Sequence, residues 1–223
     1  MQVPPRSASD MLIFYLCFPA ACWAVAILKW RKVTKLRDQL RAYRLGLDGE
    51  RYVASELDVL RANGFRVYHD FIFDMKPGGD GTTFNIDHIA IGPPGIFAVE
   101  TKTRRKLKEK TEGPQKNHEI VYDGESLTFP RGYRDTYSIR QAKLAALDLS
   151  QWLTGSAQTR VPVEAVVVIP GWMIHRKARG EVRVFSGREL AKTLRSLAPC
   201  NLTIDQLRTF ADQIEAHCRN IDC

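Results

Sequence analysis

Three charged residues interrupt an apolar segment in the middle of the chain, FNIDHIAIGPPGIFAVETKT, residues 84–103. The Gly-Pro-Pro-Gly sequence at 92–95 predicts a tight turn between two strands, which carry Asp87, Glu100 and Lys102. Because apolar residues occupy both faces of these strands, we expect the strands to be covered. Buried carboxylates need a partner, so the combination indicates a chemical site at the hairpin.

The turn fixes which residues of the hairpin are neighbours. Each step back along the first strand matches a step forward along the second: Ile91 faces Ile96, Ile89 faces Ala98, Asp87 faces Glu100, and Asn85 faces Lys102. Side chains at every second position project from one face of a strand, and directly opposed Cβ atoms lie about 4.5–5.5 Å apart. The acids and the lysine are therefore expected on one face.

Two opposed carboxylates destabilise a strand pair unless a cation lies between them. Mg²⁺ is held by carboxylates and water, often with only one or two protein carboxylates plus a substrate phosphate. Lys102 would then stabilise negative charge on a phosphoryl oxygen or orient the attacking water. The alternative is a simple ion pair, in which Lys102 neutralises Glu100 and Asp87 is exposed.

Two predicted helices place further polar residues near this site. Glu50 shares a helical stripe with Val53, Ala54 and Leu57, although an acid near a helix N-terminus also complements the helix dipole. Gln141 similarly shares a stripe with Leu144, Ala145 and Asp148, and its alternative is an exposed residue at the start of a helix.

The elements that must position these residues follow from periodicity and turn signals. We expect a helix at 46–63 that ends at Gly64, a strand at 65–73, the hairpin at 84–103, a second hairpin at 119–129 that turns at Asp123-Gly124, a helix at 136–153, strands at 163–169 and 182–186, and helices at 187–197 and 203–219. This order predicts an α/β fold, with a mixed sheet flanked by helices.

An apolar segment precedes these elements. Residues 11–28 contain 18 residues without a charge, and between Lys29 and Arg44 there are seven Lys or Arg and one Asp. A transmembrane helix followed by a basic connector explains both features better than a cleaved signal peptide or a buried core helix. The positive charge predicts a single-pass protein of a bacterial inner membrane, with its N-terminus outside and its C-terminal domain in the cytoplasm.

The basic composition is weak evidence for nucleic acid as a partner. Most of the net charge of +8 lies at residues 29–44, where anionic lipid headgroups beside the membrane segment account for it. The five cysteines show no spacing typical of zinc, which favours free thiols in a reducing compartment.

Four segments together resemble a nuclease family. They are GLDGERYVASEL at 46–57, NIDHIAIGPPGIFAVETKT at 85–103, the DGES hairpin near 123, and RQAKLAALDLSQWL at 140–153. An acid-bearing strand followed by Glu-x-Lys resembles the PD-(D/E)xK nuclease superfamily. Over residues 46–190 the chain is similar, more specifically, to the NERD (nuclease-related) domain.

The resemblance implies a restriction-endonuclease-like core that hydrolyses phosphodiester bonds with Mg²⁺, or with Mn²⁺. Asp87 and Glu100 would be metal ligands, Lys102 would position or activate water, Glu50 would assist the metal, and Gln141 would be a contact from the following helix. His88 occupies the family's usual position after the Asp, and we interpret it as a packed histidine beside the site.

The segment after Glu-x-Lys departs from the family, because it is longer and more charged. It carries Arg104, Arg105, Lys106, Lys108 and Lys110. These residues are candidate contacts to the phosphate backbone of a nucleic acid, and a solvated loop is the alternative.

The sequence thus predicts a tail at 1–10, a transmembrane helix at 11–28, a juxtamembrane connector at 29–45, a nuclease domain at 46–190 and a helical extension at 191–223. The function that we expect is a membrane-anchored, Mg²⁺-dependent nuclease that acts on DNA, with RNA as a second substrate class. The alternatives are a non-catalytic module that binds nucleic acid or a partner, and a purely structural membrane protein. The resemblance is compatible with a homodimer and does not fix the oligomeric state.

Overall fold

The computed structural model describes residues 8–74, 83–106, 116–155 and 160–221 of the chain. Side chains are described from Cys22 onward, apart from Ala24 and a few residues that border the gaps. The chain divides into two compact units, Met1–Leu45 and Gly46–Cys223.

The first helix is longer than the sequence pattern predicts. Helix α1 runs without interruption from Ala8 to Asp58, so the prediction of a separate helix that begins near Gly46 is wrong. A single glycine inside a helix costs only about 1 kcal/mol relative to alanine, which is too little to end it. A short 3₁₀ helix, η1 (Val59–Asn63), follows and ends, as predicted, at Gly64, whose φ of 81° is left-handed.

No helix in the described part of the chain is long and apolar enough to cross a membrane. The predicted transmembrane segment at 11–28 lies largely outside the residues with described side chains.

The larger unit is built on a mixed five-stranded sheet, as predicted. Its strands are β1 (Arg66–Asp74), β2 (Thr83–Gly92), β3 (Gly95–Thr101), β7 (Glu164–Val168) and β9 (Val182–Phe185), in the order β1-β2-β3-β7-β9. The first three strands pair antiparallel, whereas β3, β7 and β9 run parallel to one another. The carboxyl ends of β3, β7 and β9 therefore meet at one edge of the sheet.

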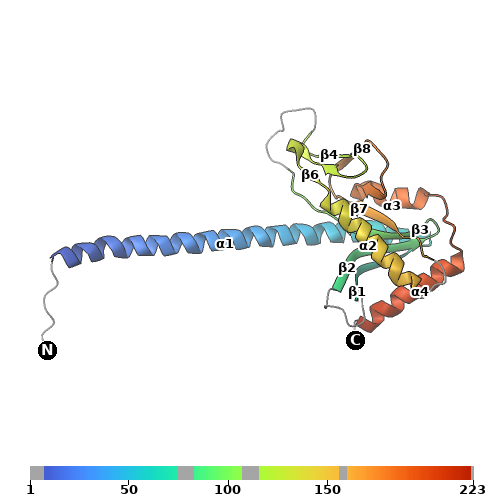
Figure 1. The fold of residues 1–223 in the computed structure, drawn as a ribbon, viewed down its shortest axis with the longest axis horizontal. Helices are drawn as coiled ribbons and strands as arrows, with labels where there is room; N and C mark the ends of the chain where they lie inside the picture. Colours follow the sequence, from blue (N-terminus) through green and yellow to red (C-terminus); the bar gives the residue numbers. More distant parts are fainter. Residues whose placement is uncertain (1–7, 75–82, 107–115, 156–159, 222–223) are drawn as a thin grey trace. The chain divides into compact units, whose positions relative to one another are not determined.

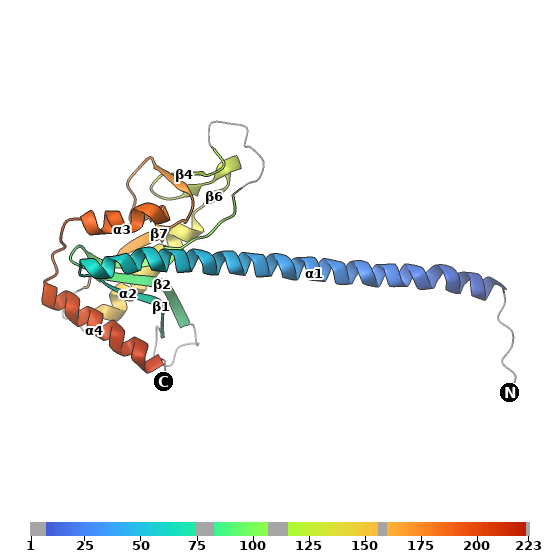
Figure 2. The same cartoon turned by 180° about the vertical axis from the view of Figure 1, so that it is seen from behind.

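Helices cover both faces of this sheet (Figures 1 and 2). Helices α2 (Tyr137–Thr154) and α4 (Ile204–Ile221) pack on one face, where Leu149 and Ile214 join a core that includes Ile89. The end of α1 and helix α3 (Gly187–Ser196) pack on the other face. Val53 and Leu190 contribute to that second core, which confirms the predicted helices on either side of a sheet.

A second sheet of four short strands was not predicted. Its order is β6 (Arg134–Asp135), β5 (Leu127–Thr128), β4 (Glu119–Tyr122) and β8 (Met173–Arg176), and a 3₁₀ helix, η2 (Pro130–Gly132), lies between β5 and β6. The predicted hairpin is present, since Tyr122 pairs with Leu127 across a turn at Asp123-Gly124. Strands of two residues carry too little periodicity to be read from sequence.

The central hairpin has the predicted register near its turn. Ile91 pairs with Ile96 and Ile89 pairs with Ala98. The β2–β3 ladder ends at His88 and Val99, so the predicted pairs Asp87–Glu100 and Asn85–Lys102 lie beyond it, and the Lys102 N–H donates instead to Val168 O. Gly92 is required here, because a Cβ at this position would stand 2.4 Å from the Phe65 ring.

Candidate active site

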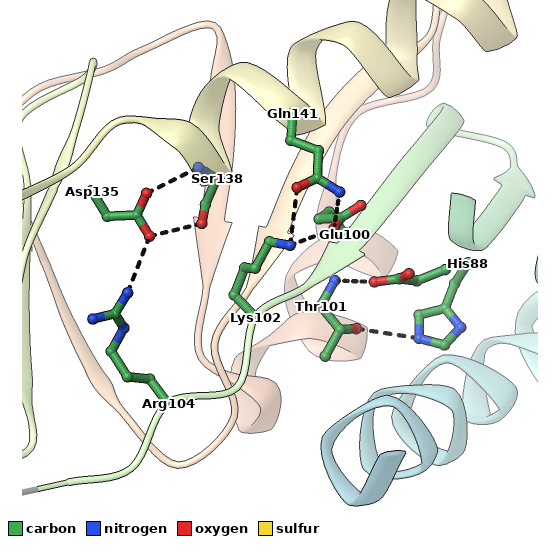
Figure 3. A network of polar contacts seen from close by, with 9 residues as sticks. His88, Glu100, Thr101, Lys102, Arg104, Asp135, Ser138 and Gln141 are labelled. Carbon is green, nitrogen blue, oxygen red and sulfur yellow. Dashed lines mark hydrogen bonds and ion pairs between the residues drawn. The ribbon is translucent and has the colours of Figure 1, made fainter. Parts of the chain in front are cut away.

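Three of the predicted site residues converge at the carboxyl end of β3 (Figure 3). The ammonium of Lys102 lies 2.7 Å from Glu100 Oε1 and donates a 3.1 Å hydrogen bond to Gln141 Oε1. The Gln141 Nε2 donates a 2.7 Å hydrogen bond to the same Glu100 oxygen. Strand β3 thus supplies the acid and the chain directly after it the lysine, while α2 supplies the amide that joins them.

Burial makes the Glu100 carboxylate the centre of this group. Its side chain is only 4% exposed, whereas that of Lys102 is 31% exposed and reaches solvent. Burial raises the pKa of Glu100, the ion pair with Lys102 opposes that rise, and the nearby Glu50 carboxylate adds to it. The ion pair of Lys102 with Glu100, which was the alternative to a metal site, is therefore present, and Gln141 bonds to both of its members.

Asp87 joins the group through the backbone of β3. The Thr101 N–H donates a 2.7 Å hydrogen bond to Asp87 Oδ2. Burial, and then the charge of Glu100, raises the pKa of Asp87 to about 6, although the Thr101 hydrogen bond and Lys102 act in the opposite direction. Asp87 is half-buried rather than exposed, which contradicts the alternative of a solvent-facing acid.

Two more carboxylates face this pair, and one of them was missed from sequence. Burial raises the pKa of Glu50, and the charges of Asp87 and Asp70 raise it further, while Lys102 lowers it. Asp70 lies in β1 between His69, which pairs with His88, and Phe71, which pairs with Ile86, so it stands opposite Asp87; its φ of 52° is left-handed. An aspartate between strand-forming residues was the available signal, because aspartate is depleted in strands.

A glycine brings Glu50 to the sheet. A Cβ on Gly49 would stand 1.9 Å from Thr103 Cγ2, so only glycine lets α1 approach the end of β3 this closely. Burial of Val53 and Leu57 on the following turn fixes the same face of the helix against the core. The predicted inward stripe is thus confirmed, and close helix–strand packing places Glu50 beside the hairpin.

A chain of polar contacts links His88 to the protein surface. The buried His88 lies 3.3 Å, through Nε2, from Thr101 Oγ1 and 2.9 Å, through Nδ1, from His69 Nδ1. His69 Nε2 lies 3.4 Å from Asp58 Oδ1. Burial, and then His69, lowers the pKa of His88 to about 4. His88 is therefore a neutral packed histidine that supports Thr101, the residue whose N–H holds Asp87.

The basic residues after β3 do not act as one group. The Arg104 guanidinium lies 4.5 Å from the Phe129 ring centroid and 4.2 Å from that of Tyr133, and it forms a 3.8 Å ion pair with Asp135. Asp135 in turn accepts hydrogen bonds from the N–H and hydroxyl of Ser138 at the start of α2 (Figure 3). Arg104 thus ties the second sheet to α2.

The other four predicted phosphate contacts are not held in this way within the described residues. Arg105 and Lys106 are exposed, whereas Lys108 lies outside the described residues, as does Lys110.

The donor atoms suit a hard divalent cation. Within the described residues, no group of three or more His, Cys, Asp or Glu side chains is arranged to hold a metal by itself. Glu100 Oε1 is occupied by Lys102 and Gln141, and Asp87 Oδ2 by the Thr101 N–H, which leaves one oxygen of each acid for another partner. One ammonium faces several acids, and a site that uses two carboxylates, water and substrate oxygens fits Mg²⁺.

Comparison with protein families matches residues 45–170 to the nuclease-related domain, NERD. No curated protein is similar to this chain. Among solved structures, it is similar to that of a protein of unknown function, AF1548, at 10% identity and a TM-score of 0.32, over 76% of this chain and 95% of the other. Similarity at that level says nothing about function. The family match spans more than half of the chain, from before Glu50 to beyond Gln141, and the protein therefore belongs to the NERD family of nuclease-related domains.

Proposed function

We propose that this protein is a metal-dependent nuclease that hydrolyses phosphodiester bonds of DNA, with Mg²⁺ or Mn²⁺ as the cofactor. The observation that carries the proposal is the contact of Lys102 and Gln141 with one oxygen of the buried Glu100. Membership of a nuclease-related family supports the same reading.

The carboxylates of Asp87 and Glu100 would hold the metal, with Glu50 beside them. A bound Mg²⁺ would polarise the scissile phosphate and lower the pKa of a bound water. Burial and mutual repulsion raise the pKa of each of these three acids. A bound divalent cation would offset this repulsion and stabilise the ionised carboxylates.

The protein's own groups have distinct tasks around that phosphate. Lys102 presents a partly exposed ammonium that would stabilise negative charge on a phosphoryl oxygen or orient the attacking water. Gln141 holds this ammonium and the Glu100 carboxylate in a fixed mutual orientation. The Thr101 N–H fixes the rotamer of Asp87.

The test is cleavage of supercoiled plasmid, single-stranded DNA and RNA with Mg²⁺, Mn²⁺ or EDTA. We expect cleavage in either metal, none in EDTA, and a loss of at least about 100-fold in Glu100→Gln. A parent protein that is stabilised by Mg²⁺ but cleaves none of these would be the non-catalytic binding module. The absence of both cleavage and metal stabilisation would reject the proposal.

We also propose that residues 11–28 anchor the nuclease in a membrane, with its catalytic domain on the cytoplasmic side. The support is the uncharged run of 18 residues and the basic residues that follow it. Fractionation of cells that express the full chain tests this proposal. Recovery in the membrane fraction after alkaline extraction is expected, and recovery in the soluble fraction would contradict it.

A further inference from the structure

A cleft of about 680 Å³ lies beyond the carboxyl ends of β7 and β9, next to the N-terminus of α3. Lys106, His118, Trp172 and Arg188 are among its lining residues. In open α/β sheets, ligands bind at the carboxyl ends of the parallel strands. The cleft occupies that position, and it is separate from the group around Glu100.

The charge of the side chains that line the cleft favours an anionic ligand. Of the described residues that line it, none is acidic, whereas Lys106 and Arg188 are both cationic. Lys106 Nζ lies 4.0 Å from the position that a Cβ on Gly171 would take, which places the ammonium over the loop that closes the cleft. The positive end of the α3 dipole adds to the same potential.

A hydrogen bond and a close packing contact hold the walls of the cleft in place. Trp172 is only 4% exposed, and its indole N–H donates a 3.1 Å hydrogen bond to Arg104 O. On the opposite wall, a Cβ on Gly187 would stand 2.2 Å from the Tyr52 ring, so this ring packs directly on the start of α3. The two aromatic side chains therefore contact the backbone two residues before Lys106 and one residue before Arg188.

One short segment, residues 102–106, connects the proposed active site to the cleft. Lys106 follows Lys102 by four residues, which limits the separation of their Cα atoms to about 14 Å. Phosphates along one strand of a duplex rise about 3.4 Å each along the helix axis. A strand held at Lys102 would therefore place a phosphate at Lys106 within about four nucleotides.

We propose that this cleft, through Lys106 and Arg188, binds a backbone phosphate of the nucleic-acid strand whose scissile phosphate lies at Glu100 and Lys102. The inference rests on the proposed nuclease function and adds the path of the substrate. It assigns the phosphate contact to Lys106 together with Arg188 of α3, which no motif indicated, and not to Arg104, whose guanidinium is held between two rings.

The test is binding of a fluorescein-labelled single-stranded oligonucleotide to the full chain in neutral detergent and EDTA, measured by anisotropy across a range of salt concentrations. Lys106→Ala/Arg188→Ala is compared with Lys192→Ala/Arg195→Ala. The control removes the same two charges from exposed positions on α3 that do not line the cleft. Circular dichroism verifies that both variants are folded.

We expect the slope of log K against log salt to fall by about 1.4 in the cleft variant, or about 0.7 per lost contact, and to stay at the parent value in the control. Equal slopes in the two variants, or no binding by the parent, would overturn the proposal. The binding assay contains no metal, so it is independent of cleavage. If the protein binds DNA at this cleft but does not cleave it in the separate assay, the proposed nuclease function is wrong and the phosphate site is retained.

Discussion

The carboxamide of Gln141 donates to Glu100 Oε1 over 2.7 Å and accepts from Lys102 Nζ over 3.1 Å, so one side chain orders both charged groups. Gln141→Glu would keep the acceptor for Lys102 but replace the donor to Glu100 with a like charge. We expect cleavage to fall by roughly 10–100-fold, in the range seen when groups that orient metal ligands are removed.

The matched control for this prediction is Gln151→Glu, an exposed position of the same helix. Initial rates of plasmid cleavage measure both variants. Equal rates for Gln141→Glu and the control would show that this amide does not order the site.

The close contact of α1 with the chain after β3 predicts a rescue. Gly49→Ala would place a methyl group 1.9 Å from Thr103 Cγ2, and overpacking of this kind typically costs about 1–3 kcal/mol of unfolding free energy. Thr103→Ala removes that carbon atom, after which the nearest Thr103 atom, its Cβ, lies 3.4 Å away.

Denaturant unfolding of both single variants and the double variant measures the coupling. The double variant is expected to be more stable than Gly49→Ala alone. Additive effects of the two changes would mean that the helix does not pack against Thr103 as described.

The raised pKa of Asp87 gives the metal-free protein a pH-dependent stability. The folded-state pKa of about 6 exceeds the ordinary value of 3.8, so the folded state binds the proton more tightly. This contribution is fully present below about pH 4 and is lost as the pH rises through 6.

Asp87→Asn should therefore be more stable than the parent in EDTA at pH 7.5, by roughly 1–3 kcal/mol, and equally stable near pH 4. Melting temperatures at the two pH values measure this difference, at about 2–4 °C per kcal/mol. Mg²⁺ at pH 7.5 is expected to stabilise the parent only. A variant less stable than the parent at pH 7.5 would be the contrary result.

The histidine chain predicts unequal effects of two substitutions. His88→Ala removes a buried ring and its contact with Thr101, and we expect a loss of about 2–4 kcal/mol of unfolding free energy. His69→Ala removes a partly exposed ring and should cost less than about 1.5 kcal/mol. Urea unfolding measures the loss of unfolding free energy in both variants. A larger loss for His69→Ala would contradict the assignment of His88 as the buried residue of this pair.

Local patterns were enough to predict the hairpin and the side of it on which Glu100 and Lys102 meet. The Gly-Pro-Pro-Gly turn fixed the register from Ile91–Ile96 inward, and period-two alternation placed Glu100 and Lys102 on one face. Helical spacing likewise identified Glu50 and Gln141 as inward residues. These features depend on short-range geometry, which a sequence carries directly.

Features that depend on distant contacts were missed. Asp70 approaches the site because the register of β1 with β2 sets it opposite Asp87. The β2–β3 ladder ends at His88 and Val99, and the Thr101 N–H donates to the Asp87 carboxylate. The role of Arg104 depends on Phe129 and Tyr133, which flank η2 in the connection between β5 and β6. Neither the register between β1 and β2 nor a two-residue strand leaves a readable period in the sequence.

The most direct measurement of the nuclease claim compares cleavage of supercoiled plasmid in Mg²⁺ by the parent, Lys102→Ala and Lys192→Ala. Both variants lose one lysine, but only Lys102 contacts Glu100 and Gln141. We predict that Lys102→Ala loses at least about 100-fold in rate, while Lys192→Ala retains the parent rate. Equal cleavage by the two variants, or none by the parent in any metal, would contradict the assignment of this site as a nuclease centre.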